Sequence, residues 1–245
     1  MLRSLQSLVG YSVAAEDGAM GKIHNFLFDD HAWIVRYFVI ETGSWLRSRR
    51  VLISPVAAGP PDWSRGTIPV SLTREQVRGS PDVDTDKPLS RQYEVALSQH
   101  YKWPHYWTAE MIFATPPPPV EVFEPDVPLE GDPHLRSARE VIGYELDAID
   151  GNVGRVEDFV VDDEDWALKH VVAEIDKPAG KRSVLISPRR IIEMSWPEMR
   201  VTARLARAFI ENCPEYDPAA PVNRKEEIIF YDYHGRPTGR GQEAA

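Results

Sequence analysis

The chain has 245 residues, a length that suits one large domain or two domains of roughly 100–130 residues each. Its net charge of −10 argues against a nucleic-acid partner and against anionic lipid, because both kinds of binding depend on Lys and Arg. The one cysteine, Cys213, excludes an intramolecular disulfide and a cysteine-based metal site. No stretch approaches the roughly 18–20 apolar residues of a membrane helix, so we expect a soluble, cytoplasmic protein without membrane insertion.

An internal repeat organises the sequence. Gly10-Tyr11 returns as Gly143-Tyr144, and the same offset of 133 residues holds without a gap to about residue 104. The repeated positions include the following pairs: Asp17-Gly18 with Asp150-Gly151, Gly21 with Gly154, Trp33 with Trp166, Val51–Pro55 with Val184–Pro188, Trp63 with Trp196 and Pro104 with Pro237. This register predicts two copies of one domain, over residues 1–108 and 135–240, joined by a Pro-rich linker over 109–134.

The first copy reads as a series of short strands. We expect them over residues 10–13, 21–28, 33–41, 50–53 and 67–71, with Asp17-Gly18 as a turn. The segment 33–41 has apolar residues on both faces of the alternating pattern, such as Val35 and Val39 on one and Phe38 on the other. This pattern predicts a central strand, and residues 166–175 take its place in the second copy.

Two short helices follow the strands. They are expected over residues 72–77, with Thr73 as N-cap, and over 90–97, with Ser90 as cap and with Tyr93 and Leu97 on one face. Several short strands would leave exposed edges, and closure into a small barrel removes them. The fold class predicted from the sequence is therefore mainly β, with two small barrels in tandem, each closed by short helices.

The order of these features resembles the PRC-barrel family. Its marks here are the Gly-Tyr start, the Asp-Gly-x-x-Gly turn, the Asp-Asp-x-x-Trp hairpin, the Ile-Ser-Pro after the fourth strand and the tail over residues 101–107. The family includes the cytoplasmic domain of the photosynthetic reaction-centre H subunit and the C-terminal domain of a ribosome-maturation factor. The resemblance implies a β-barrel adaptor that binds other proteins or RNA–protein assemblies, and it implies no catalytic site.

No pattern in the chain carries catalytic chemistry. The segment Asp147–Asn152 resembles a calcium loop, but Leu146 and Ala148 fall where ligands are required, so a strand-joining turn is favoured. The seven histidines lack metal-ligand spacing, and Ser54 and Ser187 each precede a proline. We therefore assign no catalytic, cofactor-binding or metal-binding residues and expect no cofactor.

Two groups of side chains distinguish the copies and are candidate partner-binding residues. They are the aromatic cluster of Trp103, His105, Tyr106 and Trp107 and the acidic hairpin of Asp162, Asp163 and Asp165. Aromatic anchors are enriched at interfaces, but packing within the chain, where these side chains cap their own domain, is the favoured alternative. The acidic hairpin reads either as a solvated tip or as a contact for a cation or a basic partner.

Repeated charges suggest structural ion pairs, Glu41 with Arg49 and Glu174 with Arg182. The hypothesis that follows is a non-enzymatic protein-binding or assembly module, with a protein partner and with either a homo-oligomer or pairing of the two copies within one chain. The alternatives are a subunit-like accessory of photosynthetic electron-transfer machinery and a small-ligand-binding or enzymatic protein that uses a pocket between the barrels.

Overall fold

The structure is a computed structural model that describes residues 1–43, 46, 49–81, 91–106, 135–177 and 180–217. The chain divides into two compact units. The first unit contains Leu8–His31 and Val35–Ser137, and the second contains Met1–Ser7, Ala32–Ile34 and Ala138–Ala245. Each unit is thus built mainly from one repeat, but short pieces of the chain belong to the unit of the other repeat.

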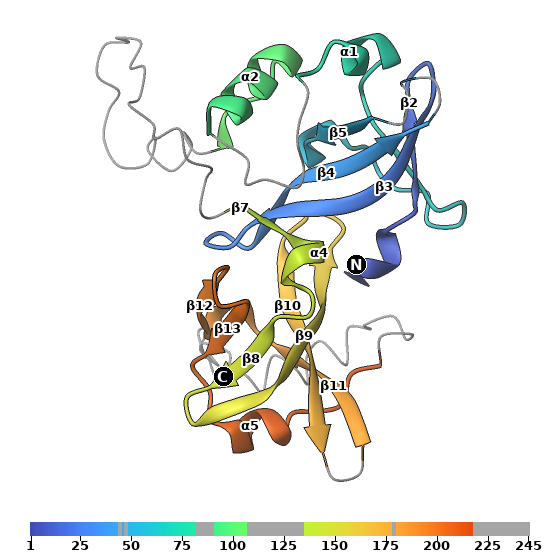
Figure 1. Ribbon diagram of the computed structural model, residues 1–245. Coiled ribbons are helices and arrows are strands. Elements are labelled where there is room, and N and C mark those ends of the chain that lie inside the picture. Colours follow the sequence, from blue (N-terminus) through green and yellow to red (C-terminus); the bar gives the residue numbers. More distant parts are fainter. Residues whose placement is uncertain (44–45, 47–48, 82–90, 107–134, 178–179, 218–245) are drawn as a thin grey trace, which may run out of the picture. The chain divides into compact units, whose positions relative to one another are not determined.

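The first unit is a mixed sheet with helices beside it (Figure 1). Its strands follow the order β5-β4-β3-β2-β6, and β7 also pairs with β3. β2 and β6 are parallel, while the other pairs with a described register are antiparallel. The elements are β2 (Ser12–Ala15), β3 (Gly18–Asp29), β4 (Ile34–Thr42, whose first residue belongs to the second unit), β5 (Arg50–Ile53), η3 (Pro55–Ala57), β6 (Thr67–Pro69), α1 (Arg74–Arg78), α2 (Arg91–Tyr101) and β7 (Leu135–Ser137).

The second unit repeats this plan. Its strands follow the order β11-β10-β9-β8-β13-β12, and β1 also pairs with β9. Its elements are β1 (Leu2–Ser4), η1 (Gln6–Leu8, whose last residue belongs to the first unit), α4 (Ala138–Val141), β8 (Glu145–Ala148), β9 (Gly151–Asp162), β10 (Leu168–Lys177), β11 (Gly180–Ile186), η4 (Pro188–Arg190), β12 (Ile191–Ser195), β13 (Arg200–Ala203) and α5 (Arg207–Glu211). Two β domains with separate mixed sheets are therefore present, as the repeat predicts.

The predicted barrels are corrected by this strand order. Both sheets are open, since β5 and β6 end one and β11 and β12 end the other. Closure into a barrel is one way to protect exposed strand edges, but here short segments of the chain cover some of these edges. Asp62 exchanges backbone hydrogen bonds of 2.8 and 3.0 Å with Thr67 of β6, and the Tyr216 N–H donates to Ser183 of β11 at 2.8 Å. Covered edges resist edge-to-edge pairing without a closed barrel.

The central strand is confirmed. β4 lies between β5 and β3, and both faces of its middle are buried, with Phe38, Val39 and Ile40 each 0% exposed. Trp33 and Trp166, in contrast, precede their strands, because both have positive φ values (56° and 57°) that continue the hairpin turn. Both residues had been expected within strands because their side chains are apolar.

Local signals in the sequence explain how the helices begin. Thr73 is confirmed as the N-cap of α1, where its hydroxyl accepts from the Gln76 N–H and the Gln76 side chain accepts from the Thr73 N–H. The turn aspartates also contribute, since Asp17 accepts from the Arg74 N–H at 2.8 Å and Asp150 from the Arg207 N–H at 2.6 Å. α2 extends the predicted helix to Tyr101, and the expected cap Ser90 lies outside the described residues.

Candidate functional site: two strand-acceptor sites

The strand before each repeat pairs with the sheet that the other repeat forms. β1 runs antiparallel to the end of β9, with Leu2 opposite Asp162 and Ser4 opposite Val160. β7 runs antiparallel to the end of β3, with Leu135 opposite Asp29 and Ser137 opposite Leu27. The two strands have the same sequence, Leu-Arg-Ser, at the repeat offset of 133. We call each receiving surface a strand-acceptor site, on β9 in the second unit and on β3 in the first.

The leucine of each strand is an apolar anchor. Leu2 and Leu135 are both 7% exposed. Leu2 lies in a cluster of buried side chains with Val160, Val172, Leu185 and Tyr216. Burying a leucine side chain contributes about 1.5–3 kcal/mol of stabilising free energy. The leucine is therefore the main apolar contribution of each Leu-Arg-Ser strand.

The arginine of each strand meets an aspartate of the hairpin that follows the acceptor strand. Arg3 Nε lies 3.2 Å from Asp163 Oδ2, and Arg136 Nε lies 2.7 Å from Asp30 Oδ2. Both carboxylates are shielded, since the Asp163 and Asp30 side chains are each 9% exposed. Shielding from solvent makes a charge-assisted hydrogen bond stronger than one on an open surface.

The serine of each strand meets a buried polar side chain, and here the sites differ. Ser4 Oγ donates to Asp158, which also accepts from the Gln6 N–H at 3.1 Å. In the first unit the matching residue is Asn25, whose Nδ2 donates to Ser137 Oγ at 2.8 Å. Burial raises the pKa of Asp158, while hydrogen bonds from Ser4 and from the Phe159 and Gln6 N–H groups oppose that rise.

These contacts define what a strand-acceptor site recognises. An extended segment supplies backbone hydrogen bonds along the strand, a leucine for an apolar pocket, an arginine for a shielded carboxylate and a serine for a buried polar group. Main-chain pairing with pockets for particular side chains is the physical basis of recognition by strand addition. Neither site was predicted from the sequence. The available signal was the identity of residues 2–4 with residues 135–137, upstream of the Gly-Tyr start.

The three aspartates of the acidic hairpin share two cationic partners, since the Met1 amino group contacts Asp162 and Asp163, and Lys169 contacts Asp162 and Asp165. Asp163 belongs to the strand-acceptor site through Arg3, and Asp162 lies 3.3 Å from the Met1 amino group and 3.9 Å from Lys169 Nζ. Asp165 accepts from Lys169 at 2.7 Å. Partial burial would raise the pKa of Asp165, but the hydrogen bonds from Lys169 and the Ala167 N–H outweigh that effect and lower it. Two of the three predicted residues thus contact β1: the Asp163 carboxylate pairs with Arg3, and Asp162 lies opposite Leu2 in the sheet.

The aromatic cluster packs against its own unit. The Trp103 ring stacks on Tyr101 with centroids 4.3 Å apart, and the Tyr106 hydroxyl donates to Glu94 Oε1 at 2.7 Å. Glu94 is 0% exposed and also accepts from Tyr37 of β4 at 3.1 Å. His105 is half-buried beside them, and Trp107 lies outside the described residues. The hydrogen bond from the Tyr106 hydroxyl to the buried Glu94 carboxylate therefore holds this segment against the first unit.

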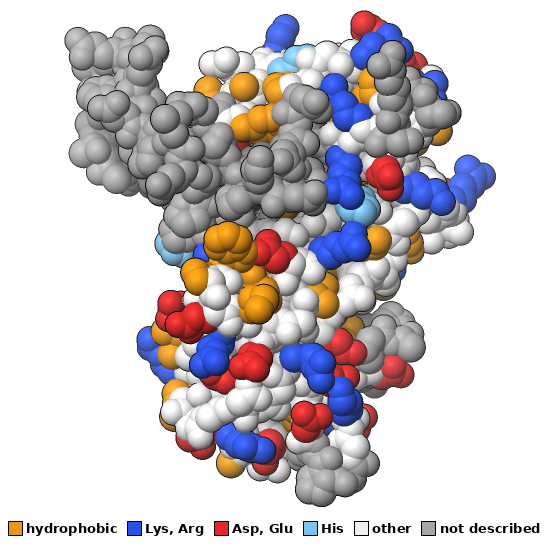
Figure 2. Space-filling view, viewed as in Figure 1, with side chains coloured by type: hydrophobic (Ala, Val, Ile, Leu, Met, Phe, Trp, Pro, Cys, Tyr) orange, Lys and Arg blue, Asp and Glu red, His pale blue; other side chains and the backbone are white. Residues whose placement is uncertain are grey.

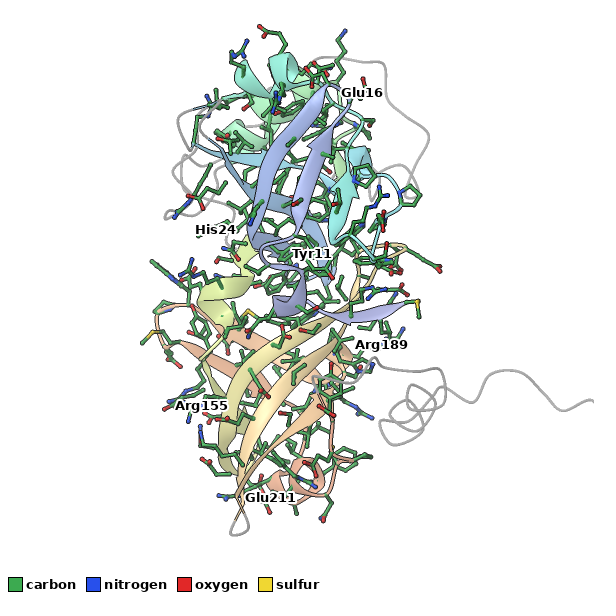
Figure 3. The ribbon with its side chains drawn as sticks, turned by 90° about the vertical axis from the view of Figure 1, so that its right-hand side faces the viewer. Tyr11, Glu16, His24, Arg155, Arg189 and Glu211 are labelled. Carbon is green, nitrogen blue, oxygen red and sulfur yellow. The ribbon has the colours of Figure 1, made fainter. Side chains whose placement is uncertain are left out.

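The suggested ion pairs are replaced by other contacts. On β11 Arg182 is opposite Ile175, so its side chain lies on the other face of the sheet from Glu174. Its guanidinium donates to the Glu211 and Cys213 carbonyl oxygens, at 2.5 and 2.8 Å. Glu174 instead contacts Lys181 and Arg155, at 2.6 and 3.1 Å, and the exposed position of Arg155 on β9 is labelled in Figure 3.

The first unit has the same arrangement. Arg49 donates to the Ser80 carbonyl oxygen and to Ser80 Oγ, at 2.7 Å each, and to the Pro81 carbonyl oxygen at 3.4 Å. Glu41 is 54% exposed and its contact is His24, with Glu41 Oε2 4.0 Å from His24 Nδ1. Arg49 and Arg182 therefore bind backbone oxygens at the ends of the short helices α1 and α5 and just after them. The sequence had suggested that both arginines pair with glutamates.

The described residues offer neither a metal-binding cluster nor a readily ionised thiol. Among the described residues, His, Cys, Asp and Glu side chains nowhere gather in a group of three that could hold a metal ion. Cys213 is buried, and burial raises the pKa of its thiol to about 11. In the same part of the chain, no helix is both long and apolar enough to cross a membrane. On the face shown in Figure 2, acidic and basic side chains are interspersed over the second unit.

No protein-family model matches the chain, and no curated protein matches it.

Proposed function

We propose that the chain is a non-enzymatic protein-binding and assembly module, and that it binds by accepting an extended segment at a strand-acceptor site. The observation that carries the proposal is the occurrence of the same acceptor twice, with a buried leucine, a shielded aspartate for arginine and a buried polar residue for serine. Segments of this kind give affinity through main-chain hydrogen bonds and specificity through alternate side chains.

A relationship to the PRC-barrel family is part of this proposal. It is supported by the order of the Gly-Tyr start, the Asp-Gly turn and the Ile-Ser-Pro after the fourth strand, which occurs in both repeats. The expectation of an adaptor follows from the resemblance, and the mode of binding follows from the contacts of β1 and β7. A place beside photosynthetic or ribosomal machinery would require partners that these contacts do not identify.

The test uses the full chain with β1 released from its site. The double variant Leu2→Ser, Arg3→Ala removes both anchors of β1, and a fluorescent peptide with the sequence of residues 1–6 is then titrated in a fluorescence-anisotropy experiment. We expect saturable binding with a dissociation constant between about 10 µM and 1 mM, because a short strand loses much of its contact energy to ordering. The unchanged chain should bind the peptide at least tenfold more weakly, since its own β1 competes.

A matched control keeps β1 released and adds Asp163→Lys. The added lysine repels the peptide's arginine, so binding should weaken by about tenfold or more. A peptide with the same composition in scrambled order should not bind. Equal binding to the released chain with and without Asp163→Lys would overturn the proposal, provided that circular dichroism shows both variants folded.

A further inference from the structure

Along the chain, β1 and β7 are each followed almost immediately by the unit whose sheet they do not join. The second unit's N-terminal piece ends at Ser7 and the first unit begins at Leu8. Likewise the first unit ends at Ser137 and the second resumes at Ala138. Each exchanged strand is therefore continuous with the body of one unit while its leucine is buried in the other. This connectivity is that of a reciprocal strand exchange, with both participants on one chain.

The two strands are also interchangeable in sequence. Both are Leu-Arg-Ser, and the acceptor aspartates Asp30 and Asp163 match at the repeat offset. Among the described residues, the serine of each strand has a different polar partner, Asn25 in the first unit and Asp158 in the second. No described contact of β1 depends on its belonging to the same chain as β9.

We propose that a second copy of this chain is a partner of the strand-acceptor site, such that β1 of one copy occupies the site on β9 of the other. This inference rests on the proposed function, since it requires that the site accepts a segment in trans. The contacts are the same in both forms, and the covalent connection favours the closed monomer by an effective concentration on the order of 1 mM. The exchanged dimer therefore forms when chains unfold and refold together at high concentration.

The test is a disulfide between two different chains. Leu2 and Asp162 are directly opposite each other, and opposed residues of antiparallel strands have Cα atoms about 4.5–5.5 Å apart, within the range that a disulfide spans. One chain carries Leu2→Cys and the other Asp162→Cys, each with Cys213→Ser, the residue that Ser80 supplies in the first repeat. The two are mixed, unfolded in urea, refolded together and oxidised.

We expect a disulfide-linked pair of twice the chain's mass on non-reducing gels, with a yield that rises at least fivefold as the protein concentration during refolding is raised from about 10 µM to 1 mM. The matched control pairs the Leu2→Cys chain with a Glu193→Cys chain, because Glu193 is exposed on β12 and outside the acceptor site. Its yield should stay at the level of random collision.

A third chain, with both Leu2→Cys and Asp162→Cys, separates the possible results. If it closes within itself while the mixed chains never link above the control, the exchange between copies is wrong, and the peptide titration decides the proposed function separately. If the mixed chains link and the dimer has the mass of two chains by light scattering, the inference stands. If even the doubly substituted chain fails to close, the pairing of β1 with β9 is itself refuted.

Discussion

At the scale of single residues, the most informative position is the buried polar group in each strand-acceptor site. Asn25 and Asp158 occupy matching places, and both accept the N–H of the next residue, at 2.8 Å for Phe26 and 2.7 Å for Phe159. Asn25 meets its serine as a donor, whereas Asp158 meets Ser4 as an acceptor. The second unit therefore holds an ionisable group where the first holds a neutral one.

This difference predicts a pH effect on stability. Because burial raises the pKa of Asp158, the folded chain binds that proton more tightly than the unfolded chain does. The stabilisation is full below the ordinary aspartate pKa and is lost as the pH rises through the raised value. Asp158→Asn should abolish this component and increase the free energy of unfolding at pH 7, measured by urea titrations between pH 4 and 8.

The mirror variant Asn25→Asp is the control for this prediction. It places a carboxyl in the matching buried position, so it should reduce stability at pH 7 and add the same direction of pH dependence to the first unit. A pH profile that is unchanged by Asp158→Asn would contradict the assignment.

The aromatic tail gives a second prediction at this scale. Tyr106→Phe removes one donor from the buried Glu94 carboxylate and should lower the free energy of unfolding by about 1–2 kcal/mol, measured by urea titration. The comparison variant is Tyr93→Phe, because the Tyr93 hydroxyl donates to the Pro81 carbonyl oxygen at 2.9 Å and its loss should cost less. Unchanged stability in Tyr106→Phe would favour the alternative in which this cluster serves a partner.

At the scale of elements, the alternation of apolar residues and the turn residues predicted most strands. The exact strand ends and the close approaches between strands could not be predicted in this way. The strands β3 and β9 begin at the turn glycines Gly18 and Gly151 and run further than the apolar pattern suggests. Gly21 and Gly154, which the repeat marks, lie where the strand crosses its neighbour. A Cβ atom on Gly154 would lie 2.0 Å from the Glu174 carbonyl oxygen.

Gly154→Ala is therefore expected to lower the free energy of unfolding by at least about 3 kcal/mol, because backbone atoms of β10 must move to admit a methyl group. Gly21→Ala should behave alike, since its Cβ would lie 2.2 Å from the Glu41 carbonyl oxygen. The control is Gly59→Ala, whose Cβ would meet the Pro69 ring at 3.3 Å, and it should cost less than about 1 kcal/mol. Chemical denaturation of all three variants checks the order.

At the scale of the whole molecule, connectivity ties the stability of each unit to the other repeat. Each unit lacks one strand unless the chain segment that precedes the other repeat provides it. A unit that receives a strand buries a leucine and forms a shielded ion pair that its own repeat cannot supply.

A cut in the linker tests this dependence. A protease site placed between Glu124 and Pro125 would divide the chain into two fragments, one carrying β1 and the other carrying β7. We expect the cut protein to elute as one particle of about the uncut mass, 27.8 kDa, in size-exclusion chromatography with light scattering. With Leu2→Asp and Leu135→Asp, whose charges cannot be buried among apolar side chains, the fragments should separate. Separation without these substitutions would refute the exchange.

The sequence by itself determined what is local or repeated. The constant offset defined the two copies, alternation of apolar residues defined β4, and the Thr73 and Gln76 pair defined the start of α1, because each depends on neighbours along the chain. Only the tertiary structure decided what depends on distant pairing. The sheets are open although closure was expected, and Arg182 lies on the other face of the sheet from Glu174. The pairing of β1 with β9 could not be predicted, because a three-residue strand holds too little local information to specify its partner.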